Sequence, residues 1–254
     1  MAFTVDLEPD WGYAGTTALR RVTPRFLRFL EARGIRATFF VVSDLLDADE
    51  GLVRDIAREH EVGSHGRTHR RLDVLSSGEA RDEVVESRAR LAAAAGPVQG
   101  FRAPFFRRCA GFWGLLRAAG YGYDASLGSV TPGPGNGRLA ARPCPFRRGG
   151  LFEFPTSAMA GGWLPLSLTW LRLLWPWSLG ALPAGAGVIY MHLHEFLPTE
   201  TASCLPAALR PALTRNCGER AWDILDAALE KLDTEFTTCR DVLSRLPVEA
   251  DVTT

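Results

Sequence analysis

Two histidines, His65 and His69, stand four residues apart and are the first candidates for chemistry in this 254-residue chain. In one helical turn, residues at this spacing share a face, so both imidazoles can reach one ion. Neutral imidazole is a ligand that suits Zn²⁺, Co²⁺ or Ni²⁺. The spacing alone is a weak signal, because a polar turn with two exposed histidines has the same pattern. The pair therefore indicates a metal site only together with other residues.

Three carboxylates, Asp6, Glu8 and Asp10, lie within five residues directly after the apolar run 2–5. Such a run followed by charged residues predicts a buried strand that ends in a polar loop. Repulsion between the carboxylates would be costly unless a cation, an arginine or a proton compensates it. An acidic surface turn explains Asp10 well and Asp6 poorly, because Asp6 closes the apolar strand. The position of Asp6 therefore favours a functional site.

Two further polar residues are found near the ends of apolar strands. Arg102 is followed by Ala103 and Pro104, and an arginine before a rigid proline turn is well placed to orient a carboxylate. A surface arginine beside a loop is the alternative. His192 lies near the end of the apolar run 188–193 and is either a core histidine or a catalytic one. Taken alone, its position favours the core.

The elements that must position these residues alternate along the chain. Strands are predicted at 2–5, 37–42, 61–63, 98–103, 121–125, 151–155 and 188–193. Helices are predicted at 17–33, 52–58, 77–95, 111–119, 220–232 and 239–246. Residues 131–150 are rich in Pro and Gly and predict a loop. The alternation implies parallel β/α units in one domain, residues 1–254. In a parallel β/α barrel the reactive residues collect at strand ends, which is where the sequence has Asp6, His65, Arg102 and His192.

The composition argues against several classes of protein. Lys+Arg and Asp+Glu both number 29, so the chain lacks the broad positive field of a nucleic-acid binder. Five cysteines without a C-x-x-C pattern argue against a disulfide framework and a zinc ribbon. No signal peptide precedes the first strand, and no apolar stretch is long enough for a membrane span. We expect a cytoplasmic protein, with the inner face of the membrane as a second location.

Together and in this order, the four pieces resemble the polysaccharide deacetylases of the NodB-homology type, carbohydrate esterase family 4. That family is similar in having an Asp motif after the first strand, an H-[ST]-x-x-H-type motif, an R-x-P motif and a late histidine. Residues 61–72 are the closest match, and the resemblance covers about residues 2–240. It implies an α/β fold, a distorted (β/α)₇ barrel. It also implies a metal-dependent hydrolase that removes an N-acetyl or N-formyl group from an amino sugar.

The resemblance implies a divalent metal, Zn²⁺ in the first place and Co²⁺ or Ni²⁺ as alternatives. His65 and His69 would be ligands, together with one carboxylate. The common family motif has two adjacent aspartates, whereas here Leu7 follows Asp6 and the next carboxylates are Glu8 and Asp10. The carboxylate ligand is therefore Glu8 or Asp10.

The resemblance also assigns acid–base roles. Asp6 would be the base, oriented by Arg102, and His192 would be the acid, with His194 as the second choice for that role. A proton donor is chemically necessary, because an amide anion is a very poor leaving group. Candidates for contact with the substrate are Pro104, Phe105, Trp163 and His194.

The segment 163–177 contains four of the seven tryptophans. A helix that covers the barrel and packs on the core is the interpretation that we favour slightly. Alternatively, exposed tryptophans could stack on sugar rings, or contact a membrane interface beside a lipid-linked sugar. The expected partner is an amino-sugar or glycan substrate, either a lipid-linked precursor or a soluble intermediate.

Two other functions remain open from the sequence. The first is an allantoinase-like or imidase-like carbon–nitrogen hydrolase on the same scaffold, which can work with a degenerate metal site. The second is a catalytically inactive sugar-binding domain. The presence of all five of the residues Asp6, His65, His69, Arg102 and His192 argues against the second alternative.

Overall fold

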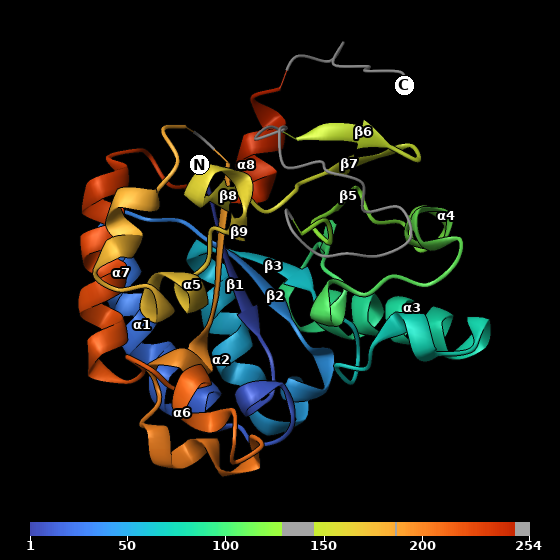
Figure 1. Cartoon of the computed structure of the whole chain (residues 1–254). Helices are drawn as coiled ribbons and strands as arrows, with labels where there is room; N and C mark the ends of the chain where they lie inside the picture. The colour runs from blue at the N-terminus through green and yellow to red at the C-terminus, as the bar shows by residue number, and fades with distance from the viewer. Residues whose placement is uncertain (129–144, 186, 247–254) are drawn as a thin grey trace.

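A curled eight-stranded sheet forms the centre of the computed structural model, which describes residues 1–128, 145–185 and 187–246 (Figure 1). Its strands are β1 (Ala2–Leu7), β2 (Thr38–Val41), β3 (Glu61–Ser64), β4 (Gly100–Phe101), β5 (Tyr123–Asp124), β6 (Phe146–Arg148), β7 (Leu151–Glu153) and β10 (Val188–His192). The strand order is β10-β1-β2-β3-β4-β5-β7-β6. All neighbouring pairs in this described sheet are parallel except β6 and β7. Seven parallel strands with helices between them make the distorted (β/α)₇ barrel that the sequence predicts.

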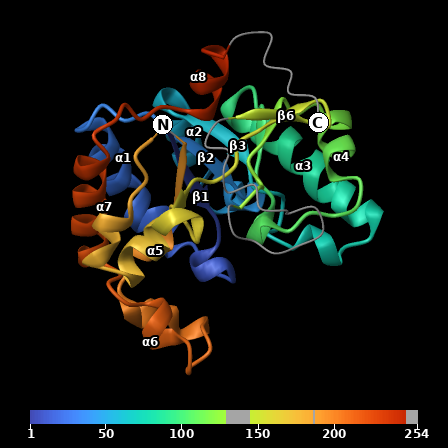
Figure 2. The same cartoon turned by 45° about the horizontal axis from the view of Figure 1, so that its top comes forward.

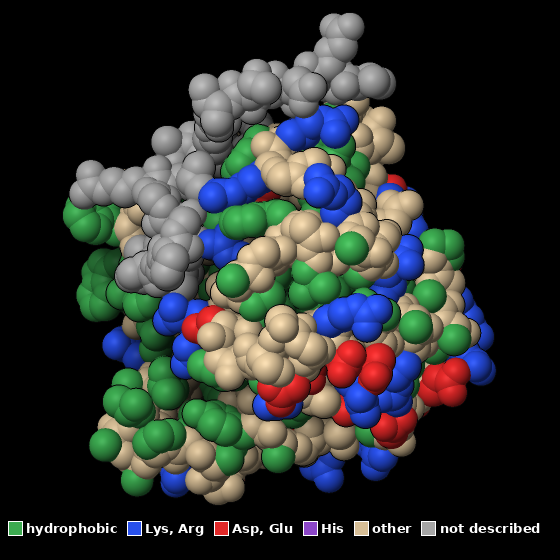
Figure 3. Space-filling view, turned by 90° about the vertical axis from the view of Figure 1, so that its right-hand side faces the viewer, with side chains coloured by type: hydrophobic (Ala, Val, Ile, Leu, Met, Phe, Trp, Pro, Cys, Tyr) green, Lys and Arg blue, Asp and Glu red, His purple; other side chains and the backbone are tan. Residues whose placement is uncertain are grey.

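Helices cover the outside of the sheet. They are α1 (Thr23–Glu31), α2 (Leu46–Glu59), α3 (Ser77–Ala95), α4 (Phe112–Ala118), α5 (Leu168–Leu173), α6 (Arg210–Leu213), α7 (Glu219–Leu232) and α8 (Cys239–Ser244). Figures 1 and 2 show α1 and α7 on one side of the sheet and α3 and α4 on the other. Figure 3 shows the side of α3 and α4, where acidic and basic side chains lie next to each other.

The central strands are continuous apolar runs in the sequence because they are buried in the core. Every residue of β1 and β2 is buried, as expected for parallel strands that are covered on both faces. Phe26 of α1 packs against Phe39 of β2 and Trp222 of α7, with ring centroids 6.3 Å and 5.9 Å away. Gly100 in β4 is required by close packing, since a Cβ there would lie 2.1 Å from the ring of Tyr123.

Several elements differ from those predicted. Part of the predicted loop 131–150 forms β6, while residues 129–144 lie outside the described residues. The predicted strand 98–103 is reduced to Gly100–Phe101, because Arg102 already turns into the loop before Pro104. The helix predicted at 52–58 begins earlier, at Leu46. A small hairpin of β8 (Ala158–Met159) and β9 (Leu164–Pro165) was not predicted, and neither was α6.

The tryptophan-rich segment 163–177 packs mainly on the core. Leu168 and Leu171 of α5 are fully buried, and Trp170 and Trp175 are partly buried against the same core. This agrees with a covering helix, the interpretation that the sequence slightly favours. Only the two ends of the segment are open to solvent, with Trp163 and Trp177 71% and 75% exposed. Within the described ranges, no helix has the length and apolar character needed to cross a bilayer.

Candidate metal and acid–base site

The carboxyl ends of four parallel strands meet at one edge of the sheet. In the register between β1 and β10, Asp6 lies opposite His192. In the register between β3 and β4, Ser64 lies opposite Phe101, so the next residues, His65 and Arg102, also come together. Since parallel strands present their carboxyl ends at the same edge, four separate motifs of the sequence converge there.

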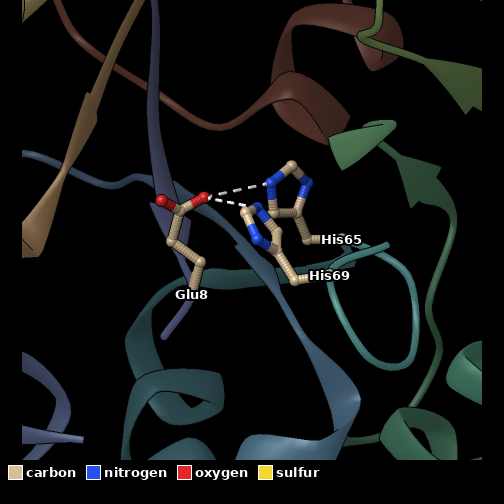
Figure 4. A group of neighbouring side chains, drawn as sticks. All are labelled: Glu8, His65 and His69. Carbon is tan, nitrogen blue, oxygen red and sulfur yellow. Dashed lines mark ion pairs between the residues drawn. The ribbon is translucent and has the colours of Figure 1, made fainter. Parts of the chain in front are cut away.

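Glu8 faces both histidines of the H-x-x-x-H motif (Figure 4). Its Oε2 atom lies 2.8 Å from Nε2 of His69 and 3.4 Å from Nε2 of His65. One ligand atom from each of these three buried residues lies within 4.8 Å of the others. Two histidines and one glutamate are a common ligand set for a catalytic zinc ion that keeps an open position.

The hydrogen bonds of the two imidazoles favour a cation between them. Nδ1 of His65 is 2.8 Å from the carbonyl oxygen of Arg102, and Nδ1 of His69 is 3.2 Å from that of Gly12. A carbonyl oxygen can only accept, so each Nδ1 carries a hydrogen and each Nε2 directs a lone pair toward Glu8. Nε2 of His69 is buried and has no hydrogen-bond partner. Three acceptor atoms that face one another need a positive charge between them, and the donor set fits a divalent cation.

The backbone that brings the histidines together is a loop and not a helical turn. Gly66 and His69 both have positive φ, 78° and 65°, so the helical-turn argument from the sequence was wrong although the two imidazoles do meet. Trp11 (φ 59°) and Phe105 (φ 55°) also adopt the left-handed conformation beside the cluster. For non-glycine residues this conformation is strained and is often found at functional sites.

Asp10 lies outside the cluster. Its carboxylate accepts hydrogen bonds from the backbone amides of Thr17 (2.8 Å) and Ala18 (2.9 Å), at the start of the helical segment that leads into α1. Both oxygens of Asp10 are therefore used as a cap for these amides. Of the two carboxylates that the sequence left open, the geometry groups Glu8 with the histidines and excludes Asp10.

Asp6 is held by Arg102. Nη1 of the fully buried Arg102 lies 2.6 Å from Oδ1 of Asp6, and its Nε donates to the carbonyl oxygen of Ala125 at 3.0 Å. The guanidinium group also lies over the ring of Phe40, 4.3 Å from its centroid. The second oxygen of Asp6, Oδ2, faces Nε2 of His192 at 3.9 Å. The predicted base, its orienting arginine and the predicted acid are thus neighbours.

His192 is held from its other side by two residues that sequence reasoning missed. Its Nδ1 lies 3.3 Å from Oε1 of Glu195, which also accepts a hydrogen bond from the backbone amide of His192. Oε2 of Glu195 lies 2.7 Å from Nε of the buried Arg172 in α5. Arg172 is the one charged residue in the apolar stretch 163–182, and a charge in such a stretch was a signal for a buried partner.

The charges around His192 shift several pKa values. Burial opposes protonation of His192, but the carboxylates of Glu8, Glu195 and Asp6 outweigh it and raise its pKa to about 9. Burial acts against ionisation of Glu195, yet the charge of Arg172 lowers its pKa to about 2. Burial also tends to raise the pKa of Glu8, but the charge of His192 and the contacts with His65 and His69 hold it well below its usual range. At neutral pH this places a protonated imidazole beside ionised carboxylates.

His194 belongs to the same group of side chains. Its ring stacks on that of His192 with centroids 5.0 Å apart, and its Nδ1 lies 3.7 Å from Oε1 of Glu8. Burial, followed by the charge of His192, lowers the pKa of His194 to about 4. A neutral His194 next to a protonated His192 is consistent with His192 as the proton donor of the pair.

The other candidates for substrate contact, Phe105, Pro104 and Trp163, differ in their exposure and in their position relative to the cluster. Phe105 is 47% exposed and its ring centroid lies 4.6 Å from that of His69, so it borders the cluster on the solvent side. Pro104, the residue before Phe105, is buried. Trp163 lies in the connection between β8 and β9, and none of the described ring contacts or hydrogen bonds joins it to the cluster.

Comparison with known proteins finds similar sequences and a shared fold. Residues 1–123 match the family model of the polysaccharide deacetylases. The peptidoglycan-N-acetylglucosamine deacetylase PgdA of Listeria monocytogenes is 34% identical over 67 residues, which are 26% of this chain and only 14% of that protein.

Solved structures share the fold over nearly the whole chain. A peptidoglycan N-acetylglucosamine deacetylase, Bc1960, has a TM-score of 0.57 at 18% identity, over 95% of this chain and 86% of that chain. A CE4 family pseudoenzyme from Bacillus anthracis, BA3943, has a TM-score of 0.54 at 15% identity, over 95% of this chain and 65% of that chain. The family model matches residues 1–123 and the fold is shared over nearly the whole chain, so this chain is similar to the polysaccharide deacetylases.

Proposed function

We propose that this protein is a metal-dependent N-deacetylase that hydrolyses the N-acetyl or N-formyl group of an amino sugar. The observation that carries the proposal is the meeting of two sets of side chains at one edge of the sheet. Glu8, His65 and His69 direct three acceptor atoms at one another. Asp6 and His192 face each other next to them. Hydrolysis of an amide requires a polarised carbonyl, a base and an acid, and these residues can serve all three needs.

Glu8, His65 and His69 would hold the cation. When bound, a divalent cation would supply positive charge for the amide carbonyl oxygen and increase the acidity of water. The carbonyl groups of Arg102 and Gly12 fix the tautomers of the two imidazoles, so that both Nε2 atoms are ready to ligate.

Asp6 would accept the proton of the attacking water. Arg102 occupies one of its oxygens and keeps the carboxylate in place, while Oδ2 remains directed at the site. The water oxygen forms a bond to the carbonyl carbon as Asp6 takes the proton. The carbonyl oxygen, on which negative charge develops, would face the cation site formed by Glu8, His65 and His69.

His192 would donate a proton from Nε2 to the departing nitrogen as the carbon–nitrogen bond breaks. Glu195 accepts from Nδ1 and so leaves Nε2 as the atom that faces the reaction. The products are a free amine on the sugar and a carboxylic acid. The raised pKa of His192 keeps the donor protonated at neutral pH.

The substrate would be a glycan with N-acylated amino sugars. The names of similar proteins, which act on N-acetylglucosamine of peptidoglycan, support this class. The exposed ring of Phe105 beside His69 offers an apolar face for a sugar ring. A lipid-linked or soluble precursor and a cytoplasmic location stay predictions. Membrane contact through the segment 163–177 gains no support from its packing on the core.

The test is deacetylation by the purified full chain after metal loading. We expect one divalent ion per chain, release of acetate from N-acetylglucosamine oligomers or of formate from N-formyl sugars, and no ring opening of hydantoins or allantoin. Asp6→Asn and His192→Ala should lower kcat by about 10²–10⁴-fold and still bind the metal. The surface variant Asp226→Asn is the control.

The two alternative functions predict other results. Ring opening of a heterocycle without acetate release would identify an imidase-like enzyme. Sugar binding without any turnover by the metal-loaded protein would place this chain with pseudoenzymes such as the one from Bacillus anthracis.

A further inference from the structure

Glu8 has two carboxylate oxygens that face different residues. Oε2 faces the imidazoles of His65 and His69, whereas Oε1 faces Nδ1 of His194 at 3.7 Å. A glutamate has one more rotatable bond than an aspartate, so it needs an additional contact to present one oxygen in one direction. This contact has to come from the side of Oε1.

His194 is fixed in a way that suits this task. Its ring lies between Trp11, at 4.8 Å between centroids, and His192, at 5.0 Å with an interplanar angle of 16°. Trp11 in turn donates from Nε1 to the hydroxyl of Thr201 at 3.2 Å. The ring of His192 stacks on that of His194 and the ring of Trp11 packs against it with a tilt of 38°, so two neighbouring rings limit the movement of the imidazole.

Nδ1 of His194 is buried and has no hydrogen-bond partner among the described residues. A buried donor without an acceptor costs about 1–3 kcal/mol. The acceptor that faces it is Oε1 of Glu8. Their separation of 3.7 Å is longer than a hydrogen bond, so the Glu8 side chain would have to move toward His194 for the bond to form.

We propose that His194 is a positioning residue that donates from Nδ1 to Oε1 of Glu8 and thereby directs Oε2 at the cation site. The inference rests on the metal dependence proposed above and assigns His194 a role apart from proton donation and substrate contact. Residues that hold metal ligands through hydrogen bonds typically contribute 10–100-fold to metal affinity. The loss of the His194 hydrogen bond should therefore be measurable as a weaker metal affinity, without an assay of turnover.

Two substitutions separate the hydrogen bond from the stacking. His194→Phe keeps a ring between Trp11 and His192 but has no donor. His194→Asn loses the ring but keeps an amide N–H about where Nδ1 lies. His60→Phe is a matched control, because His60 is also buried and its Nδ1 bonds to the amide of Ala37 at the opposite end of β2.

The measurement is the Kd of the metal-free full chain for Zn²⁺, by competition with a chromophoric chelator, after circular dichroism has verified folding of each variant. We expect His194→Phe to raise the Kd about 10–100-fold. His194→Asn should stay within a few-fold of the wild type, and the His60 control should be unchanged.

Three results would overturn the inference. If His194→Phe binds Zn²⁺ as tightly as the wild type, Glu8 needs no help from His194, and the proposed function is unaffected. If the Phe and Asn variants are weakened equally, the ring acts by packing alone. If the wild type itself binds no Zn²⁺, the metal-dependent function fails together with the inference.

Discussion

Replacing Glu195 by glutamine should move the basic limb of the pH–activity profile to lower pH. Glu195→Gln keeps an oxygen that can accept from Nδ1 of His192 but removes the negative charge 3.3 Å from that atom. The protonated form of His192 is the active acid, so activity falls as the pH rises through its pKa. A lower pKa therefore brings the loss of activity to lower pH.

The magnitude follows from the distances. Two unit charges about 4 Å apart interact by about 4 kcal/mol at an effective dielectric constant of about 20, and by about 1 kcal/mol in bulk water. One pKa unit corresponds to about 1.4 kcal/mol, so loss of the Glu195 charge should lower the pKa of His192 by about one to three units. The positive charge of Arg172, no longer neutralised at 2.7 Å, acts in the same direction.

The assay is kcat for acetate release between pH 5.5 and about 10, with wild type and variant loaded with the same cation. Glu235→Gln is the matched control, because it removes an exposed carboxylate paired with Arg245 at 3.0 Å. Thermal unfolding has to verify that the variant is folded, since breaking a buried ion pair can cost about 3–5 kcal/mol. A basic limb at the same pH in the folded variant would refute the role of Glu195 and with it the assignment of His192 as the acid.

Three further predictions concern the metal and the stability of the fold. Glu8→Gln should raise the Kd for Zn²⁺ at least about 10-fold, as measured by chelator competition, whereas Asp10→Ala should leave it unchanged. Asp10→Ala should instead lower the free energy of unfolding by about 1–2 kcal/mol in urea titrations, because Thr17 and Ala18 lose their cap. Burial lowers the pKa of His60 to about 4 from the usual 6.5, so the unfolded chain takes up a proton first. The free energy of unfolding should therefore fall by about 3 kcal/mol more between pH 6.5 and 4 in the wild type than in His60→Gln, and equal slopes would disprove this.

The strand ends of the site could be predicted from the sequence. Short apolar runs located β1, β3 and β10, although β1 continues to Leu7 and β10 ends at His192, and parallel pairing then brings together polar residues at or just beyond the strand ends. Asp6, His65 and His192 belong to this group because their positions depend on local pattern alone. The general architecture was predictable for the same reason.

The choice between Glu8 and Asp10 could not be predicted. It depends on the left-handed turn at Trp11, a conformation that tryptophan rarely adopts and that no local rule indicates. The turn directs Asp10 to two amides whose positions are set by the following helix. Similarly, H-x-x-x-H spacing suggested a helical turn, while the chain uses a loop with positive φ at Gly66 and His69.

The local sequence pattern could not predict the contact between Arg172 and Glu195 either. The two residues are 23 positions apart and meet because Ser167, directly before α5, pairs with Tyr190 of β10. A lone arginine in an apolar stretch indicates a buried partner, but it does not identify which carboxylate is the partner. The missed residues of the site are therefore those fixed by packing between elements.

The two carboxylates that flank His192 are held alike. Asp6 and Glu195 each have one oxygen bound to a buried arginine and the other directed at His192. Both arginines use further donors on backbone carbonyl groups, so neither guanidinium can turn away if its carboxylate is removed. Truncation to alanine would leave a buried, unpaired charge and disturb folding and catalysis together. Asp6→Asn can keep its one oxygen on Arg102, so a loss of turnover in this variant reports on proton transfer, whereas the one oxygen of Glu195→Gln can face either Arg172 or His192.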